Sequence, residues 1–187
     1  MTLFRSKYRI ETTRLKHHAY THGWYFVTIC TRDRLQWFGE IRDGKTALSE
    51  MGRIVEQCWS DIPHHFPHVS LDVFVVMPDH VHGIIVMNAT DDVLIVETPD
   101  RASLQSKRLQ SKRHPTLGVI INQCKGSASR RLHLSGYPEF SWQPRYHDRL
   151  IRSSAELNVI RKYIRCNPEH WTKETIPWND DAFAWGM

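Results

Sequence analysis

The stretch VFVVMPDHVHGIIVM, residues 73–87, decides how the middle of this chain folds. It contains two runs of apolar and β-branched residues, separated by Pro78 and Asp79, which favour a turn. The pattern therefore predicts two strands with a break at Pro78. His80 and His82 are two positions apart at the start of the second strand, and residues i and i+2 of a strand share one face. Their imidazoles are expected side by side.

The residues before this stretch predict a strand, a hairpin and a helix. WYFVTICT, residues 24–31, is rich in β-branched and aromatic residues and predicts a buried strand. A hairpin with its turn at Asp43-Gly44 is expected next. The spacing i, i+3, i+4, i+7, i+8 then predicts an amphipathic helix that Pro63 ends. Its buried face would hold Met51, Ile54, Val55, Cys58, Trp59 and Ile62.

The residues after this stretch predict a helix, a strand and a second helix. The first helix, within residues 115–134, would bury Leu117, Ile120, Ile121, Cys124, Ala128 and Leu132. Tyr146–Arg152 could form a strand, and Ser153-Ser154-Ala155-Glu156 fits a capping box that starts the last helix. That helix would bury Leu157, Ile160 and Ile164. It should end near Asn167, because the residue before a proline disfavours the α region.

This order of elements predicts the α+β class, a ferredoxin-like or RRM-like antiparallel sheet with helices packed mainly on one face. With 187 residues, the chain fits one domain spanning 1–187. Residues 89–115 differ in composition and include LQSKRLQSKR, in which five residues are repeated in tandem. We expect a flexible connector at about 89–115, with an exposed helix as the alternative.

Composition and charge give limited information about the binding partner and the cellular location of the protein. A formal charge of +5 favours an anionic partner such as nucleic acid. The four cysteines form no Cys-x-x-Cys pair, which is typical of buried free thiols. The N-terminus lacks the apolar core of a signal peptide, and no apolar run approaches the length of a membrane span. We therefore expect a cytoplasmic protein with no membrane partner.

The histidine pair gains meaning from its position. With 12 histidines in 187 residues, chance gives about 0.8 His-x-His pairs, so the motif alone has no statistical weight. Two buried imidazoles on one strand face need partners, however, and a shared divalent cation would satisfy both. Tyr163 and Asn167, four residues apart, share a helix face. Taken singly, Tyr163 is an ordinary core-edge aromatic and Asn167 an ordinary helix C-cap. As a set with the histidines, they could supply a hydroxyl nucleophile and an amide ligand.

An ordered series of motifs resembles a known family. The series is Met77-Pro78-Asp79-His80-Val81-His82, Trp142-Gln143, Arg145-Tyr146, Ile151-Arg152 and Tyr163-Ile164-Arg165-x-Asn167-Pro168. It resembles the single-tyrosine transposases with a His-hydrophobic-His motif, and most closely their REP-associated branch, related to the insertion-sequence-200 enzymes. The strand at 23–31 and the helix at 117–131 are also similar to that branch, so the resemblance spans most of the chain.

The resemblance implies a mechanism and a metal site. His80, His82 and Asn167 would be metal ligands and Tyr163 the nucleophile. Attack on single-stranded DNA next to a hairpin would leave a 5′-phosphotyrosine and a free 3′-hydroxyl, and a second 3′-hydroxyl could reverse the step. The cofactor would be Mg²⁺ or Mn²⁺, with histidine ligation favouring manganese somewhat.

The same resemblance implies DNA contacts near the tyrosine. Candidates for phosphate contacts are Arg145, Arg152, Arg161, Lys162 and Arg165, and Trp142 or Tyr146 could stack on bases. The alternative is that these residues are solvated charges and core aromatics. The partners would be single-stranded DNA and DNA hairpins. Whether the protein is a monomer with the tyrosine helix in cis or a homodimer with that helix in trans stays open.

Two other functions remain open on the sequence alone. The chain could be a domesticated DNA-hairpin binding protein with little or no catalysis. It could also be a small α+β protein in which the histidine pair binds a structural metal.

Overall fold

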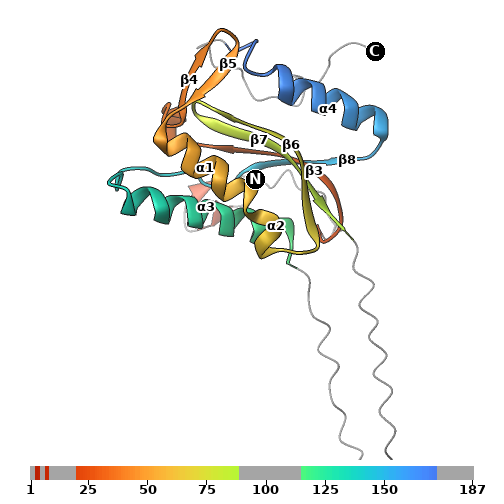
Figure 1. Ribbon diagram of the computed structural model, residues 1–187. Coiled ribbons are helices and arrows are strands. Elements are labelled where there is room, and N and C mark those ends of the chain that lie inside the picture. Colours follow the sequence, from red (N-terminus) through yellow and green to blue (C-terminus); the bar gives the residue numbers. More distant parts are fainter. Residues whose placement is uncertain (1–2, 5–6, 9–19, 89–114, 172–187) are drawn as a thin grey trace, which may run out of the picture.

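The computed structural model describes residues 3–4, 7–8, 20–88 and 115–171. A four-stranded antiparallel sheet with the strand order β6-β7-β3-β8 forms its central layer (Figure 1). The strands of this sheet are β3 (Gly23–Cys30), β6 (Val69–Met77), β7 (His80–Met87) and β8 (His147–Ile151). The helices are α1 (Glu50–Ser60), α2 (Ile62–His65), α3 (Leu117–Leu134) and α4 (Ser154–Cys166), with a 3-10 turn at Arg32–Arg34. Two further antiparallel pairs are β1 (Leu3–Phe4) with β2 (Lys7–Tyr8), and β4 (Gly39–Arg42) with β5 (Lys45–Leu48).

The connections within the sheet give the ferredoxin-like topology. Strands β3 and β6 both pair antiparallel with β7, so they run parallel to each other, and α1 lies in the crossover between them. Strands β7 and β8 both pair antiparallel with β3, and α3 lies in their crossover. The resulting order β-α-β-β-α-β is that of the split βαβ motif, which confirms the predicted α+β class.

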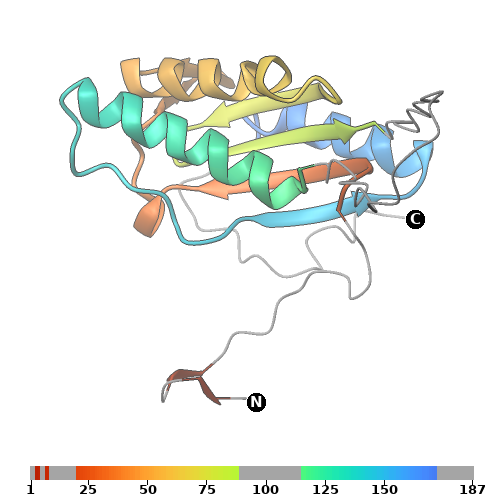
Figure 2. The same cartoon turned by 90° about the horizontal axis from the view of Figure 1, so that it is seen from below.

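The helices cover the two faces of the sheet unequally. Helices α1, α2 and α3 contribute to a core on one face, and α4 packs on the opposite face (Figures 1 and 2). Strand β3 therefore sends Tyr25, Val27 and Ile29 into the first core and Phe26 into the second. Strand β7 is buried at every position, because both of its faces are covered. The helices thus lie mainly on one face, as predicted.

Some local features follow their sequence signals and one does not. Pro63 does not end the helix before it, because α1 ends at Ser60 and Pro63 lies in the first turn of α2. The hairpin β4–β5 turns at Asp43 and Gly44, whose φ angles are 49° and 69°, as a two-residue turn with both central residues in the left-handed region requires. The connector expected at about 89–115 lies outside the described residues except for Pro115. In the segments that the structure describes, no helix has the length and apolar character needed to cross a membrane.

Candidate active site

The two predicted histidines lie side by side at the centre of the sheet. His80 opens β7 and His82 follows on the same strand face, with ring centroids 4.4 Å apart. The two residues are 3% and 0% exposed. Phe26 of β3 packs against His82, with a centroid distance of 5.3 Å, on the face of the sheet that α4 covers. The prediction of two neighbouring imidazoles on one strand face is confirmed.

A neighbouring group engages the Nδ1 atom of each histidine. The Nδ1 of His80 is hydrogen-bonded to Oδ1 of Asp79 at 2.5 Å. The Nδ1 of His82 is hydrogen-bonded to the hydroxyl of Thr28 at 2.8 Å, because Thr28 faces His82 in the β3–β7 register. Hydrogen bonds at one ring nitrogen fix the orientation and favour metal ligation by the other. The Nε2 atoms are therefore the ones suited to bind a cation.

Helix α4 brings Tyr163 to this pair within a single chain. The phenol oxygen of Tyr163 lies 3.3 Å from Nε2 of His82. The Tyr163 ring also meets Phe26 edge-on, with centroids 6.0 Å apart. Ile160 and Ile164, one residue or one turn away on the helix, are buried in the core beneath α4. The predicted nucleophile and one predicted metal ligand are thus adjacent in cis.

The start of α4 is fixed by capping interactions. The Ser153 side chain accepts a hydrogen bond from the Glu156 amide at 3.1 Å, as the predicted capping box requires. The Glu156 carboxylate, however, accepts from the Arg152 amide at 2.9 Å and from Nε of Arg149 at 2.8 Å. It therefore ties the helix start to β8.

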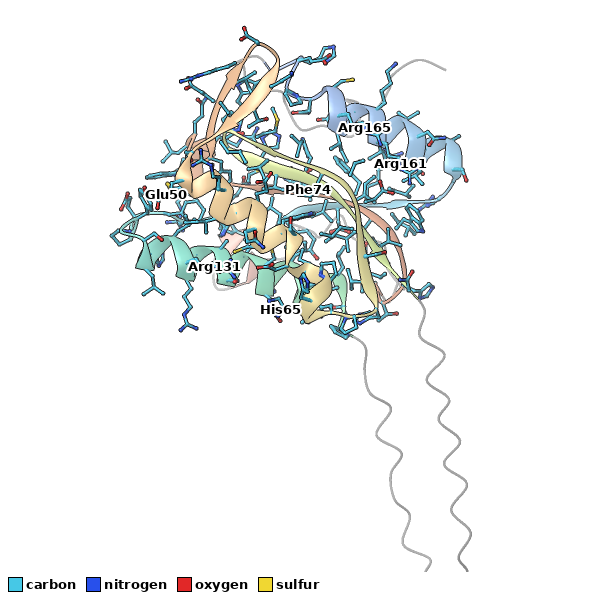
Figure 3. All side chains as sticks on the ribbon, in the orientation of Figure 1. Glu50, His65, Phe74, Arg131, Arg161 and Arg165 are labelled. Carbon is cyan, nitrogen blue, oxygen red and sulfur yellow. The ribbon has the colours of Figure 1, made fainter. Side chains whose placement is uncertain are left out.

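An ion pair also anchors the middle of α4. Arg161 donates to both carboxylate oxygens of Asp72 on β6, with its Nε at 3.1 and 3.2 Å. The Arg161 guanidinium also lies 5.8 Å from the ring centroid of Trp24. Figure 3 shows Arg161 and Arg165 on α4, across the sheet from Glu50 of α1 and Arg131 of α3. Arg161 therefore holds α4 against the sheet two residues before Tyr163.

Asn167 lies one helical turn after Tyr163 and is 9% exposed. The predicted helix end is correct, since α4 stops at Cys166, but the predicted backbone of Asn167 is wrong. Its φ and ψ of −56° and −43° remain helical although Pro168 follows. The helix ends here because Pro168 has no N–H to donate to the carbonyl of Ile164. The helical backbone keeps Asn167 directly above the tyrosine.

Burial shifts the protonation equilibria of the site. Desolvation lowers the pKa of His80 to about 3, and it lowers the pKa of His82 well below its usual value. Both imidazoles are therefore neutral at pH 7, the form that binds metals. Burial also raises the pKa of Tyr163, while a hydrogen bond with the Asn167 side chain and the charge of Arg34 oppose this rise. The free phenol is protonated at neutral pH.

The three candidate ligands, two imidazoles and one side-chain amide, are suited to a divalent cation, although none of them carries a negative charge. His80 and His82 offer Nε2 atoms and Asn167 offers an amide oxygen. Among the described residues, no group of three or more His, Cys, Asp or Glu side chains is placed to hold a metal. Two neutral nitrogens and one amide oxygen would leave positions on an octahedral ion for phosphate oxygens and water.

The residues predicted to contact DNA are five cations, most of them exposed, and two aromatic residues that pack against the core. Arg145, Arg152, Lys162 and Arg165 are exposed, and Arg161 is committed to Asp72 as described above. Trp142 is 9% exposed, packs against Phe38 and Phe140, and donates from Nε1 to the Lys125 carbonyl at 3.1 Å. A base could stack on Trp142 only if this packing opened, so the structure gives Trp142 a core position. Tyr146 is half-buried against the same core.

Three residues near the site were missed at the sequence level. Arg34 reaches Asp79 with an Nε–Oδ2 distance of 2.9 Å. Thr28 is the partner of His82, and His147 on β8 lies in the same cross-strand row, since both histidines pair with Thr28. Thr28 and His147 could be found only from strand register. Nothing in the sequence marks Arg34.

The chain is similar to known proteins in sequence and in fold. No family model matches the chain. An uncharacterized protein of Haemophilus influenzae is 32% identical over 168 residues, which cover 89% of this chain and 92% of the relative. The solved structure of a REP-associated tyrosine transposase bound to a REP hairpin aligns with a TM-score of 0.56. It is 18% identical and covers 87% of this chain and 78% of that chain. The chain therefore belongs to the family of this Haemophilus influenzae protein, and it has the fold of the REP-associated tyrosine transposase.

Proposed function

We propose that this protein is a metal-dependent, single-tyrosine transposase that cleaves and rejoins single-stranded DNA next to hairpins. One observation carries the proposal: the Tyr163 hydroxyl lies 3.3 Å from Nε2 of His82, beside the neighbouring ring of His80. This arrangement puts a hydroxyl nucleophile next to two neutral imidazoles. The shared fold with a transposase whose structure holds a REP hairpin supports a hairpin as the DNA partner.

The proposed step is a transesterification. The Tyr163 oxygen attacks the phosphorus of a DNA phosphodiester, so that the O–P bond to tyrosine forms and the P–O3′ bond breaks. The phenol proton passes to water, and the departing 3′-oxygen takes up a proton from water. The products are a 5′-phosphotyrosine and a free 3′-hydroxyl, and attack by a second 3′-hydroxyl reverses the step. Bond energy is retained in the adduct, so no nucleotide cofactor is needed.

His80, His82 and Asn167 would hold Mg²⁺ or Mn²⁺. When bound, such a cation acts as a Lewis acid that polarises the phosphate and stabilises the charge that develops on it. The neutral histidines support this assignment, because metal binding needs no proton release from them at pH 7. The raised pKa of the Tyr163 phenol also indicates that nearby positive charge is needed to form the phenolate.

Four exposed cations would bind the DNA backbone around the site. Lys162 and Arg165 flank Tyr163 on α4, and Arg152 precedes the same helix. Arg145 lies in the loop before β8, which Lys125 holds by donating to the carbonyls of Gln143 and Arg145 at 2.8 Å each. Such contacts give affinity without sequence selectivity.

A labelled-hairpin assay tests the proposal. Single-stranded hairpins that flank the gene, labelled at the 5′ or the 3′ end, are incubated with Mn²⁺, Mg²⁺ or chelator and run on a denaturing gel. A 5′-phosphotyrosine retains the downstream fragment, so we expect the 3′ label on the protein and the 5′ label on a shortened free strand. The adduct should require metal and should be absent from Tyr163→Phe.

Tyr137→Phe is the matched control. Tyr137 is also half-buried, but its hydroxyl donates to Glu50 of α1 at 3.1 Å, and it packs against the core on the face of the sheet opposite α4. This variant should form the adduct at the wild-type rate. Hairpin binding without an adduct under any metal would instead support the second candidate, a domesticated hairpin-binding protein. The raised pKa of Tyr163 is the observation that favours this alternative.

A further inference from the structure

The Asp79 carboxylate bridges His80 and an arginine from another loop. Oδ1 of Asp79 is hydrogen-bonded to Nδ1 of His80 at 2.5 Å, and Oδ2 lies 2.9 Å from Nε of Arg34. Asp79 is 4% exposed. Both of its oxygens thus have a partner in the protein, so Asp79 is arranged to orient His80 and not to serve as a ligand itself.

The backbone of this turn is held from the same side. The amide of Thr31 donates to the Asp79 carbonyl at 2.9 Å, and the Thr31 hydroxyl donates to it at 3.1 Å. The amide of Phe38 donates to the Pro78 carbonyl at 2.9 Å. The segment 31–38 therefore holds both residues of the turn between β6 and β7 and fixes the backbone position of Asp79.

Arg34 is held in an uncommon conformation. Asp33 and Arg34 have φ angles of 54° and 56°, a region that non-glycine residues rarely adopt without support from their surroundings. Nη1 of Arg34 also donates to Sγ of Cys30 at 2.9 Å, one residue before the Thr31 clamp. The Arg34 side chain is one quarter exposed, so its charge lies at the rim of the buried site. The guanidinium therefore has a fixed place beside Asp79.

We propose that Arg34 and Asp79 form a positioning pair, which locks His80 as the Nδ1–H tautomer and aims its Nε2 at the metal position. This inference rests on the proposed function only in taking His80 as a ligand. Because a carboxylate can only accept a hydrogen bond from the ring, it fixes which nitrogen is protonated. Arg34 in turn holds the carboxylate in place through its contact with Oδ2.

Metal binding without DNA tests this pair. The concentration of free Mn²⁺ is followed by electron paramagnetic resonance during titration of the DNA-free protein, with melting curves to confirm folding. Asp79→Ala should weaken Mn²⁺ affinity by about 10–100-fold, the usual effect of losing such a partner. Asp79→Asn, which keeps an acceptor oxygen, should weaken it less. Arg34→Gln should weaken it, and Arg34→Lys should restore part of the loss.

Asp61→Asn is the control, because it breaks another Asp–Arg pair, with Arg131 of α3, on the face of the sheet opposite α4 and away from His80 and His82. Its Mn²⁺ affinity should match that of the wild type. Wild-type affinity in both Asp79 variants would overturn the positioning pair. Equal affinity in the wild type and His80→Ala would instead remove the metal site from the proposed function, so the two failures are distinct.

The tautomer itself provides a second readout. In ¹⁵N-labelled, metal-free wild-type protein, long-range ¹H–¹⁵N spectra should show His80 protonated at Nδ1. Protonation at Nε2 would overturn the inference even if the Asp79 variants failed to fold. If Arg34 instead contacts a DNA phosphate, Arg34→Gln should leave both the His80 tautomer and the Mn²⁺ affinity unchanged. That result would overturn the positioning pair.

Discussion

The Tyr163 hydroxyl lies 3.3 Å from Nε2 of His82, although 81 residues separate the two in sequence. The contact exists because α4 docks on the face of the sheet opposite α1 and α3. Its geometry therefore depends on the residues that hold α4 in place and on the packing of β7.

The Arg161–Asp72 pair should stabilise α4 as a unit. Arg161→Ala and Asp72→Ala should each lower the urea midpoint of unfolding. The double variant should lose no more unfolding free energy than the more destabilised single variant. The reason is that either change removes the same bidentate interaction. A double-mutant cycle with urea unfolding measures this. Additive losses would mean that the pair does not couple α4 to β6.

Gly83, directly after His82, should not tolerate a side chain. A Cβ atom at this position would lie 2.4 Å from Cζ2 of Trp59 and 2.9 Å from Cβ of Phe74. Gly83→Ala should therefore cost roughly 1–3 kcal/mol of unfolding free energy through overpacking.

Gly126→Ala on α3 is the matched control, because a Cβ there meets nothing within 4 Å. This change should stabilise the protein by about 0.5–1 kcal/mol, since alanine favours a helix interior. Thermal and urea unfolding of both variants measure the two effects. Equal effects of the two substitutions would contradict the packing described for β7.

Acid should destabilise the metal-free protein through the buried histidines. His82 has a folded pKa well below 6.5, so the unfolded chain binds a proton between pH 6.5 and the folded pKa that the folded chain does not. The unfolding free energy therefore falls as pH drops below 6.5, by about 1.4 kcal/mol per pH unit for each such histidine. Above pH 6.5 this contribution is constant.

Urea unfolding of the wild type and His82→Gln, in chelator at pH 7, 6 and 5, measures this effect. Asp79 acts in the opposite direction, because burial raises its pKa, but it is common to both proteins. The stability advantage of the wild type should shrink between pH 6 and pH 5. Parallel pH profiles would show that His82 can be protonated in the fold.

The cations that flank the tyrosine should contribute uniformly to DNA affinity. Lys162→Ala and Arg165→Ala should each weaken binding of every hairpin sequence and reduce the slope of log K against log salt by about 1. Arg53→Ala, at an exposed position on α1 on the other side of the sheet, should leave the slope unchanged. Fluorescence anisotropy over a range of salt concentrations measures this. Equal slopes for all three variants would place the DNA elsewhere.

The spacing of apolar residues predicted most helices and strands of this fold, because the residues that it places on one face are also the buried ones. All six residues expected on the buried face of α3 are buried. His80 and His82 share a face because strand geometry alone requires it. In α1 the same reasoning placed Ile54 in the core, where it is only half-buried at the edge. The chemistry of the side chains allowed Tyr163 to act with the histidines, and the resemblance assigned it as the nucleophile.

The supports of the site could not be predicted in the same way. Thr28 lies opposite His82, which follows it by 54 residues, only because of the register between β3 and β7. Arg34 reaches Asp79 from a loop with left-handed residues, which no local signal marks. The resemblance offered Trp142 as a residue that could stack on bases, with a core aromatic as the alternative, and its indole packs in the core. Such contacts depend on tertiary packing, which single-sequence patterns do not encode.

The residue that carries DNA after cleavage can be identified in the adduct itself. The Mn²⁺-dependent adduct is trimmed with nuclease, digested with trypsin and analysed by tandem mass spectrometry. We expect a 5′-phosphonucleotide on Tyr163, in a peptide that contains Tyr163-Ile164-Arg165. A nucleotide on any other residue, or DNA cleavage that persists in Tyr163→Phe, would contradict it.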